Sequence, residues 1–297
     1  MTPPANADAL PEARSEDRFE VRPEVRPEVR VAPGKSAIAR DFGAASRTYN
    51  PAARLQRYMG QVMLDQVAEL SDMGDVISVA LDLGCGTGWF SGELGARSNA
   101  GQTVGADLAP GMLEFARSAC PADLQWLAAD AEALPLADNS VDLIFSNLMI
   151  QWSENPWRVL SECRRVLRPG GQLLVSTLLE GTLFELKEAW RQADPDHQHV
   201  NRFDCAEDYQ YWASTTLPDA TLTRETVRLD YPSPMALLSE LKAIGAGFKG
   251  ASRRSSATAP GRLRAMCRHY PVSRDGQIYA TYQAAWLTCR LPDSRTS

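Results

Sequence analysis

Leu-Asp-Leu-Gly-Cys-Gly-Thr-Gly occupies residues 81–88 and is the most informative stretch of the chain. A strand-like run from Ile77 leads into glycines at every second position, and a helical pattern follows from about Trp89. Glycines at such a turn allow positive φ angles and let the backbone approach a ligand closely. A glycine pattern alone also fits an ordinary tight turn between a strand and a helix, so its surroundings decide between the two.

Acidic residues lie at the ends of three successive predicted strands. Asp82 lies in the first strand, Asp107 ends the second, and Asp130 ends the third. The carboxyl ends of neighbouring strands in an open α/β sheet meet where ligands bind. There Asp107 can accept hydrogen bonds from ribose hydroxyls, and Asp130 can accept one from an adenine amino group. These positions predict a ligand that contains a nucleoside.

The glycine turn lacks the features of a phosphate-binding loop. Its spacing is GxGxG rather than the GxGxxG of dinucleotide sites, and it contains no Lys or Arg. A pyrophosphate at the following helix N-terminus is therefore not expected. The pattern favours a cofactor that carries a nucleoside but no phosphate.

Strand-like and helical segments alternate after an amphipathic stripe that begins at Leu55. Alternation of this kind is typical of βαβ units in a parallel sheet covered on both faces. We predict an α/β, Rossmann-like fold: a mostly parallel seven-stranded sheet with helices on both faces and a helical insertion over its carboxyl edge. The expected strands are 77–83, 102–106, 124–128, 141–146, 172–177, 221–231 and 277–287, and the expected helices begin near Trp89, Pro110, Pro156 and Met235.

The chain divides into a tail and one domain. Residues 1–36 hold six of the 19 prolines and a single aromatic residue, Phe19, so they cannot bury enough apolar surface to offset the entropy of ordering. We predict a disordered tail over 1–36 and a single domain over 37–297. Its expected parts are an N-terminal helical cap (37–74), a cofactor-binding core (75–182), and the last strands with a substrate-covering helical insertion (183–297).

Composition excludes several classes of protein. The chain has 297 residues, 44% of them hydrophobic, and its net charge of -6 argues against a nucleic-acid binder. No run approaches the roughly 20 apolar residues of a membrane span, and no secretory signal is present. The six cysteines form no CxxC pair, and we interpret His197 and His199 as an exposed loop pair, so no metal site is expected. We expect a cytoplasmic monomer.

The glycine turn and the strand ends together resemble the class I S-adenosylmethionine-dependent methyltransferases. Residues 79–88 are similar to their first motif, 105–113 to the segment with the ribose-binding acid, 129–131 to the adenine edge, and 166–171 to the lead-in to the fifth strand. The resemblance implies the class I methyltransferase fold, S-adenosyl-L-methionine as cofactor and S-adenosyl-L-homocysteine as product. It assigns cofactor binding to Asp82, Gly84, Cys85, Gly86, Gly88, Asp107, Leu108, Met112, Asp130, Ala131 and Asn147.

Segments outside these motifs resemble the malonyl-acyl-carrier-protein O-methyltransferases of biotin synthesis. The resemblance implies an enzyme that converts the free carboxyl of malonyl-acyl-carrier protein to its methyl ester, with acyl carrier protein as partner. The chain departs from the family at Asn50, where the family usually has Asp, and in its C-terminal ending. The similar segments are 41–50, 55–57, 146–152, 200–203, 231–233, 241–246 and 281–282.

Such an acceptor makes modest chemical demands. A carboxylate is already ionised at neutral pH, so positioning and water exclusion matter more than a general base. Tyr49 and Arg202 are the candidate catalytic residues. Arg202 is a candidate because a guanidinium presents paired donors to planar oxygens. The alternatives are a buried packing aromatic for Tyr49 and a surface salt bridge for Arg202. Gln151 and Trp152 are expected to line the substrate pocket, although Trp152 also fits a packing role.

Basic residues cluster between Leu241 and Arg274, where eight Lys and Arg occur with no Asp or Glu. Acyl carrier proteins are acidic, and a basic face would accelerate and orient their docking. A charged, flexible loop is the alternative. The residues expected to dock the carrier are Lys242, Lys249, Arg253, Arg254, Arg262, Arg264 and Arg268.

Two other functions stay open at this point. A small-molecule methyltransferase of the same fold, acting on a quinone or polyketide, predicts an apolar pocket and indifference to carrier protein. A cofactor-binding subunit without turnover is motivated only by Asn50. The sequence also leaves open the choice between a carrier-protein and a coenzyme A thioester.

Overall fold

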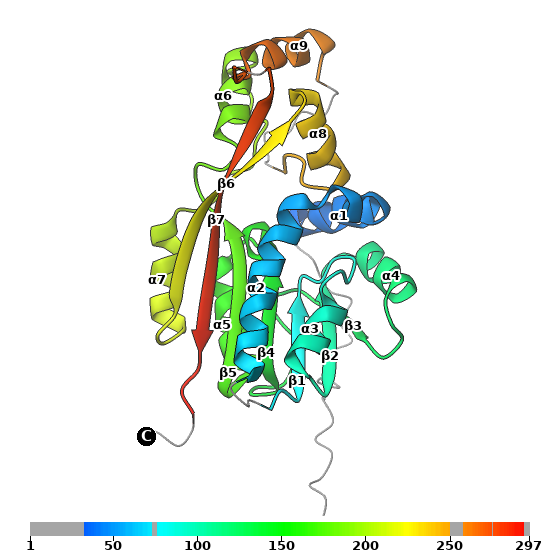
Figure 1. Ribbon diagram of the computed structural model, residues 1–297, viewed down its shortest axis with the longest axis vertical. Coiled ribbons are helices and arrows are strands. Elements are labelled where there is room, and N and C mark those ends of the chain that lie inside the picture. Colours follow the sequence, from blue (N-terminus) through cyan, green and yellow to red (C-terminus); the bar gives the residue numbers. More distant parts are fainter. Residues whose placement is uncertain (1–32, 73–75, 250–257, 275, 294–297) are drawn as a thin grey trace, which may run out of the picture.

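A computed structural model describes residues 33–72, 76–249, 258–274 and 276–293, with the backbone alone at 33 and 68–72 (Figure 1). The predicted disordered tail therefore lies outside the described residues, except for its last part. Helix α1 (Pro33–Ala52) begins at Pro33 rather than at the expected Ala37. Proline is favoured in the first turn of a helix, so the composition that indicated a tail also permits this start.

Within the described residues, seven strands form one sheet in the order β3-β2-β1-β4-β5-β7-β6. Strands β1 to β5 pair in parallel, and β7 runs antiparallel to both β5 and β6. The prediction of a mostly parallel seven-stranded sheet is confirmed. The strands are β1 (Val79–Leu83), β2 (Gln102–Asp107), β3 (Gln125–Ala128), β4 (Val141–Asn147), β5 (Leu167–Leu178), β6 (Thr221–Tyr231) and β7 (Ile278–Arg290).

Helices cover both faces of the sheet. The buried side chains of α2 (Arg54–Asp72) and α3 (Ser91–Ser98) pack on one face, and those of α5 (Pro156–Val166) and α7 (Ala206–Thr216) pack on the other. Helix α4 (Pro110–Ala119) lies beside β2 and β3, and a short 3₁₀ helix, η1 (Ile150–Trp152), follows β4.

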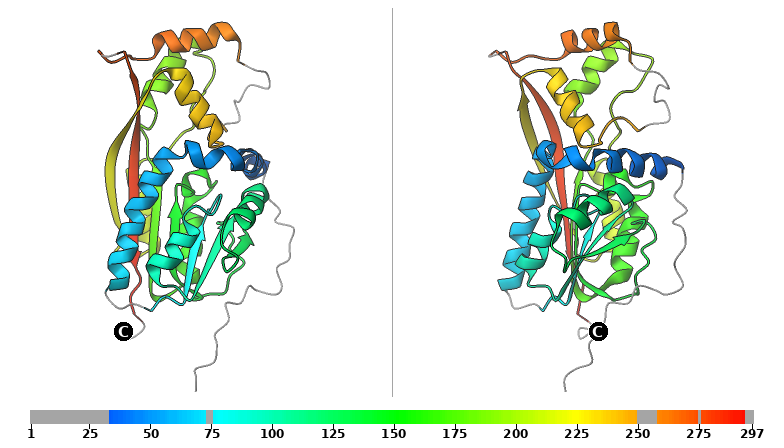
Figure 2. Two further views of the ribbon diagram at one scale, coloured as in Figure 1. Left: turned by 45° about the vertical axis from the view of Figure 1, so that its right-hand side comes forward. Right: turned by 90° about the vertical axis from the view of Figure 1, so that its right-hand side faces the viewer.

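Three further helices form the predicted insertion. Helices α6 (Phe184–Ala193), α8 (Pro234–Ala243) and α9 (Pro260–His269) gather at one end of the molecule, beyond the central strands, while α1 crosses between them and the sheet (Figures 1 and 2). The long strands β6 and β7 extend from the sheet to this group of helices (Figure 1).

The start of β5 differs from the prediction. Helix α5 begins at Pro156 as expected and ends at Val166, but β5 begins at Leu167 instead of Gln172. Val141 pairs with Leu167 and Leu143 with Gln172, so the intervening Arg-Pro-Gly-Gly is an irregularity within the strand pair. A bulge of this kind absorbs residues that break regular strand geometry.

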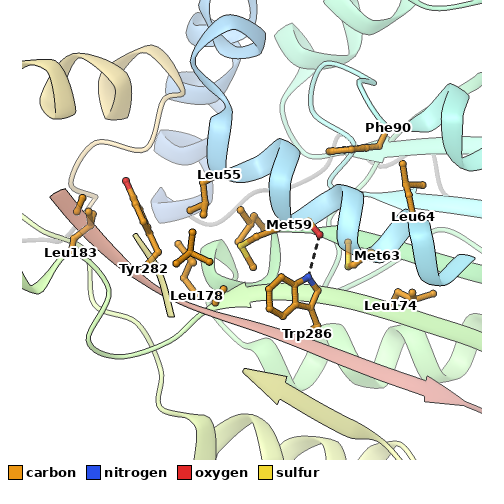
Figure 3. Packing of buried hydrophobic residues seen from close by; sticks show 14 of the residues in the cluster. Leu55, Met59, Met63, Leu64, Phe90, Leu174, Leu178, Leu183, Tyr282 and Trp286 are labelled. Carbon is orange, nitrogen blue, oxygen red and sulfur yellow. Dashed lines mark hydrogen bonds between the residues drawn. The ribbon is translucent and has the colours of Figure 1, made fainter. Parts of the chain in front are cut away.

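Helix α2 buries its apolar stripe against the centre of the sheet. Met59, Met63 and Leu64 are fully buried there, and the indole Nε1 of Trp286 in β7 donates a hydrogen bond to the Met59 carbonyl at 3.2 Å (Figure 3). Side chains from β5 and β7 contact the same helix (Figure 3). This packing fixes the position of α2, which continues the chain from α1 above the carboxyl edge of the sheet.

Candidate active site

A cavity of about 750 Å³ lies between the sheet and the helices above it. Its floor is formed by the carboxyl ends of β1, β2 and β3, and its roof by α1 and residues 238–249. An apolar part of the lining, here called the apolar wall, includes Leu178, Leu183, Leu186, Phe203 and Tyr282. Seven of the expected cofactor residues therefore share this space with the expected pocket residues Gln151 and Trp152: Gly84, Asp107, Leu108, Met112, Asp130, Ala131 and Asn147.

The glycine turn has the backbone that its sequence predicts. Gly84, Gly86 and Gly88 have φ angles of +77°, +54° and +75°. A Cβ on Gly84 would lie 2.3 Å from the Met149 side chain, so a larger residue does not fit there. No atom lies within 4 Å of a Cβ placed on Gly86, and this open space beside the turn gives a ligand room to approach the backbone.

Asp107 holds the turn and remains available to a ligand. Its Oδ2 accepts a hydrogen bond from the Gly86 amide at 2.8 Å, and its Oδ1 accepts one from the Ala109 amide at 2.7 Å. Each carboxylate oxygen keeps a further acceptor site. Burial raises the pKa of Asp107 although these amides oppose the shift. Its place in the cavity lining, beside Leu108 and Met112, fits the predicted contact with ribose hydroxyls.

Asp82 lies deeper than Asp107, beside a small neighbouring cavity lined also by Cys85, Tyr49 and Asn147. Its side chain accepts a hydrogen bond from Ser91 Oγ at 2.7 Å. Burial raises the pKa of Asp82 to about 7; the Ser91 hydrogen bond opposes this shift and the charge of Asp107 adds to it. Burial also raises the pKa of the Cys85 thiol, so it stays protonated at neutral pH.

Asp130 is paired with Lys35, a residue that no pattern in the sequence singles out. Lys35 Nζ in α1 lies 3.0 and 2.8 Å from the Asp130 carboxylate oxygens and 2.9 Å from Glu132 Oε1. Burial lowers the pKa of Lys35, but the hydrogen bonds to the two carboxylates outweigh it and the net shift is upward. Asp130 and Ala131 line the cavity, and the contact of Asp130 with adenine stays a prediction.

The end of α1 is tied to the glycine turn. Asn50 Oδ1 accepts a hydrogen bond from Thr87 Oγ1 at 2.6 Å. An aspartate can accept the same bond, so the departure at position 50 changes a charge without removing the contact. Tyr49 lines the cavity next to this tie. Burial, and then the charge of Asp107, raise the pKa of Tyr49 far above its usual value, so its phenol stays protonated.

Residues at the end of β4 and just after it line the cavity. Asn147 donates to the Gln56 carbonyl at 2.9 Å and accepts from Ser176 at 2.7 Å. Gln151 donates to the Leu148 carbonyl at 2.9 Å. Trp152 packs edge-to-face on Phe42 of α1, with ring centroids 5.1 Å apart. All three residues line the cavity, and their contacts with cofactor and substrate stay predictions.

Arg202 is placed differently from the other candidates. It is exposed and is absent from the cavity lining, although its neighbours Asn201 and Phe203 are part of that lining. Its catalytic role stays a prediction without a supporting contact. Gly86 and Gly88 are also absent from the lining, and a Cβ on Gly88 would lie 2.5 Å from Trp126 and 2.7 Å from Cys120.

The predicted docking residues fall into three groups. Lys242 and Lys249 line the cavity roof. Arg262, Arg264 and Arg268 are exposed on α9, and Arg262 Nε lies 3.4 Å from Asp194 Oδ1. Arg253 and Arg254 lie outside the described residues.

The interpretation of His197 and His199 as an exposed loop pair was wrong. His199 Nε2 lies 2.9 Å from the buried carboxylate of Asp194, and its ring stacks on Trp190 at 3.8 Å. His197 Nδ1 lies 3.2 Å from the same carboxylate, and His199 lines the cavity. Asp194 follows α6 directly and provides a partner that histidine spacing alone does not indicate.

The part of the chain that the structure describes holds no group of three or more His, Cys, Asp or Glu arranged to bind a metal ion. None of its helices combines the length and the apolar character that crossing a membrane requires.

Comparisons with known proteins agree with this geometry. Residues 81–175 match the family model described as a methyltransferase domain. The malonyl-[acyl-carrier protein] O-methyltransferase of Methylococcus capsulatus is 46% identical over 217 residues, which cover 72% of this chain and 78% of that protein. The one from Hahella chejuensis is 38% identical over 256 residues, covering 85% and 89%.

A solved structure supports the fold class. The YcgJ protein of Bacillus subtilis superposes with a TM-score of 0.56 over 80% of this chain and 100% of that one, at 16% sequence identity. The predicted class I methyltransferase fold is confirmed. With relatives of 46% and 38% identity matched over most of their length, the chain belongs to the family of malonyl-[acyl-carrier protein] O-methyltransferases.

Proposed function

We propose that this protein transfers a methyl group from S-adenosyl-L-methionine to the free carboxyl of malonyl-acyl-carrier protein, as part of biotin synthesis. The observation that carries the proposal is the shared cavity, whose lining combines strand ends that resemble a cofactor site with the apolar wall around Leu178. The chain belongs to the family of malonyl-[acyl-carrier protein] O-methyltransferases, and this supports malonyl-acyl-carrier protein as the methyl acceptor.

The residues present fit the cofactor. Open space beside Gly86 admits a ligand next to the backbone, and Asp107 retains acceptor sites for ribose hydroxyls. Asp130 and Ala131 would border the adenine, and Asn147 and Tyr49 the methionine part. When bound, S-adenosyl-L-methionine supplies an electrophilic methyl group on a sulfonium.

The chain's own contribution is positioning and the exclusion of water. A malonyl carboxylate is deprotonated at neutral pH, so no residue has to remove a proton before methyl transfer. Helix α1 and residues 238–249 line the side of the cavity opposite the strand ends, and limited access of water there would favour attack by a poorly solvated carboxylate. The protonated Tyr49 phenol provides a donor in the cofactor half of the same cavity.

Exposed basic residues support docking of an acidic carrier protein. Lys242 lies on α8, and Arg264 and Arg268 lie on α9. These helices stand at the same end of the molecule as the cavity roof (Figure 1). A thioester arm that enters the cavity beside α8 and α9 would reach the part that is expected to hold the acceptor.

A methyl-transfer assay tests the proposal. Labelled S-adenosyl-L-methionine is offered with malonyl-carrier protein, malonyl-coenzyme A and acetyl-carrier protein side by side. We expect label on the malonyl carrier protein and none on the acetyl form, because only the former has a free carboxylate. Cofactor binding without transfer to any malonyl thioester would contradict the proposal.

One observation favours a second candidate, a small-molecule methyltransferase. The wall formed by Leu178, Leu183 and Leu186 is apolar and would also suit a hydrophobic acceptor. Transfer to a quinone or polyketide in the same assay, with malonyl species inert, would select this candidate.

A further inference from the structure

Three lysines line the cavity in the part of the chain that the structure describes: Lys35, Lys242 and Lys249. Lys35 is held between two carboxylates at the adenine edge, and Lys242 is exposed. Lys249 differs from both, because its side chain is only 11% exposed and it pairs with Asp41 of α1 rather than with the carboxylates at the adenine edge. Lys249 is therefore the buried cation that an acceptor carboxylate inside the cavity can reach most easily.

The ammonium group of Lys249 lies between the roof and the pocket wall. Its Nζ is 2.5 Å from Asp41 Oδ2 and 5.7 Å from the centroid of the Phe42 ring. Phe42 in turn packs on Trp152, a pocket residue after β4. These contacts place the positive charge of Lys249 close to the aromatic pair Phe42 and Trp152, at the part of the cavity that is expected to hold the acceptor.

Asp41 has a second cationic partner. Arg40 Nε and Nη2 lie 3.4 and 3.3 Å from Asp41 Oδ1, and the Arg40 side chain is 70% exposed. If Lys249 turned toward another carboxylate, Asp41 would keep a neighbouring cation. The exchange avoids the large cost of leaving a buried charge unpaired.

Hydrogen bonds fix the backbone at Lys249, whereas its long side chain can move. Asn201 Oδ1 accepts a hydrogen bond from the Lys249 amide at 2.8 Å, and Asn201 Nδ2 donates to the Gly247 carbonyl at 3.3 Å. This anchoring holds the roof segment in place. The flexible four-carbon stem then allows the ammonium group to change partners over a short distance.

We propose that Lys249 binds the free carboxylate of the acceptor, leaving Asp41 to Arg40 when the substrate enters; this assignment rests on the proposed function. Lysine is a point charge that pairs with one carboxylate oxygen, whereas arginine would hold both. The other oxygen keeps its lone pairs for bond formation with the methyl group. Lys249 is thus a specificity-determining residue that distinguishes malonyl from acetyl acceptors.

Binding of malonyl- and acetyl-carrier protein, measured by calorimetry in the presence of S-adenosyl-L-homocysteine, tests the assignment. We expect wild type to bind the malonyl form more tightly, and Lys249→Met to reduce that preference about 10- to 100-fold, the range for loss of a charged hydrogen bond. The KM for malonyl-carrier protein should rise in parallel. Lys249→Arg should restore part of the preference.

Controls separate recognition from structural support. Lys187→Met removes an exposed lysine of α6 and should change neither affinity. Asp41→Asn removes the resting partner of Lys249 and should leave the malonyl preference intact or increase it. If the pair only braced the roof, Lys249→Met and Asp41→Asn would weaken both carrier forms equally. Cofactor affinity confirms that each variant is folded.

The possible failures are distinguishable. Wild type that methylates malonyl-carrier protein while Lys249→Met keeps the full malonyl preference would overturn the assignment of Lys249 alone. Wild type that binds cofactor but methylates no malonyl thioester would overturn the proposed function, and this assignment with it.

Discussion

Asp82 and Asp107 lie on neighbouring strands but in different surroundings. Two backbone amides hold the Asp107 carboxylate, whereas the buried Asp82 accepts a hydrogen bond from the Ser91 hydroxyl. The charged form of Asp82 thus has fewer hydrogen bonds to replace those that it makes to water, so burial raises its pKa more. Asp82 is therefore the carboxyl group whose charge state changes near neutral pH.

We expect Asp82→Asn to become more stable relative to wild type as pH rises from about 4 to about 7. The pKa of Asp82 is raised to about 7 in the folded protein, against about 4 in an unfolded chain. Between these values the folded wild type binds more protons than its unfolded form, so its free energy of unfolding falls by up to about 1.4 kcal/mol per pH unit. Asparagine does not titrate and can still accept the Ser91 hydrogen bond.

Urea unfolding at several pH values measures this difference. The exposed Asp123 provides a control, because Asp123→Asn should follow the wild-type pH dependence. A constant gap between Asp82→Asn and wild type across this range would show that Asp82 titrates normally.

Helix α1 is the element that closes the cavity, and it rests on α4 through two glycines. A Cβ on Gly111 of α4 would lie 3.0 Å from the Gly43 α-carbon and 3.1 Å from its carbonyl oxygen. A Cβ on Gly43 would lie 3.5 Å from Gly111, an ordinary contact. The two helices therefore approach closely, and they tolerate an added methyl group on one side only.

These distances predict opposite results for two similar substitutions. Gly111→Ala should push α1 away from α4 and cost about 1–3 kcal/mol of stability, as overpacking does. It should also weaken cofactor binding, since α1 carries Lys35 and Tyr49. Gly43→Ala should be neutral or stabilising by up to about 1 kcal/mol, because alanine favours a helix interior. Thermal unfolding and cofactor calorimetry measure both effects; equal behaviour of the two variants would refute the asymmetry.

At the scale of the whole molecule, charge is distributed unevenly. The chain carries a net charge of -6, which opposes association with an acidic protein at long range. The exposed arginines of α9 work against this repulsion at the end where the roof lies. Association of this kind depends on ionic strength, because exposed charges are screened within about 10 Å at 0.1 M salt.

Reversing two of these charges tests the docking surface. The double variant Arg264→Glu and Arg268→Glu should lower kcat/KM for malonyl-carrier protein about 10-fold at low salt, and the loss should shrink in 0.5 M salt. The double variant Arg158→Glu and Arg164→Glu on α5 makes the same change in net charge at other exposed positions. It should have little effect. Equal losses for both would indicate net charge rather than a docking surface.

Local patterns predicted the features that depend on neighbouring residues. The glycine turn, the strand ends at Asp107 and Asp130 and helix α8 follow from spacing and periodicity alone. Pairs far apart in the sequence could not be found in this way. Lys35 meets Asp130 across 95 positions, and Asn201 anchors Lys249 across 48. Such pairs depend on how α1 and the roof segment fold over the sheet, and a single sequence contains no periodic signal for them.

The place of β7 between β5 and β6 also sets an order of assembly. Strand β6 is synthesised before β7, yet the strand that it pairs with in the sheet is β7. The five parallel strands can pair as they leave the ribosome, whereas β6 must wait for the strand that follows it. Helices α6, α8 and α9 lie between β5 and β7 in the sequence, so the acceptor half of the cavity is completed last. A nascent chain can therefore form the cofactor-binding part of the site before the acceptor-binding part exists.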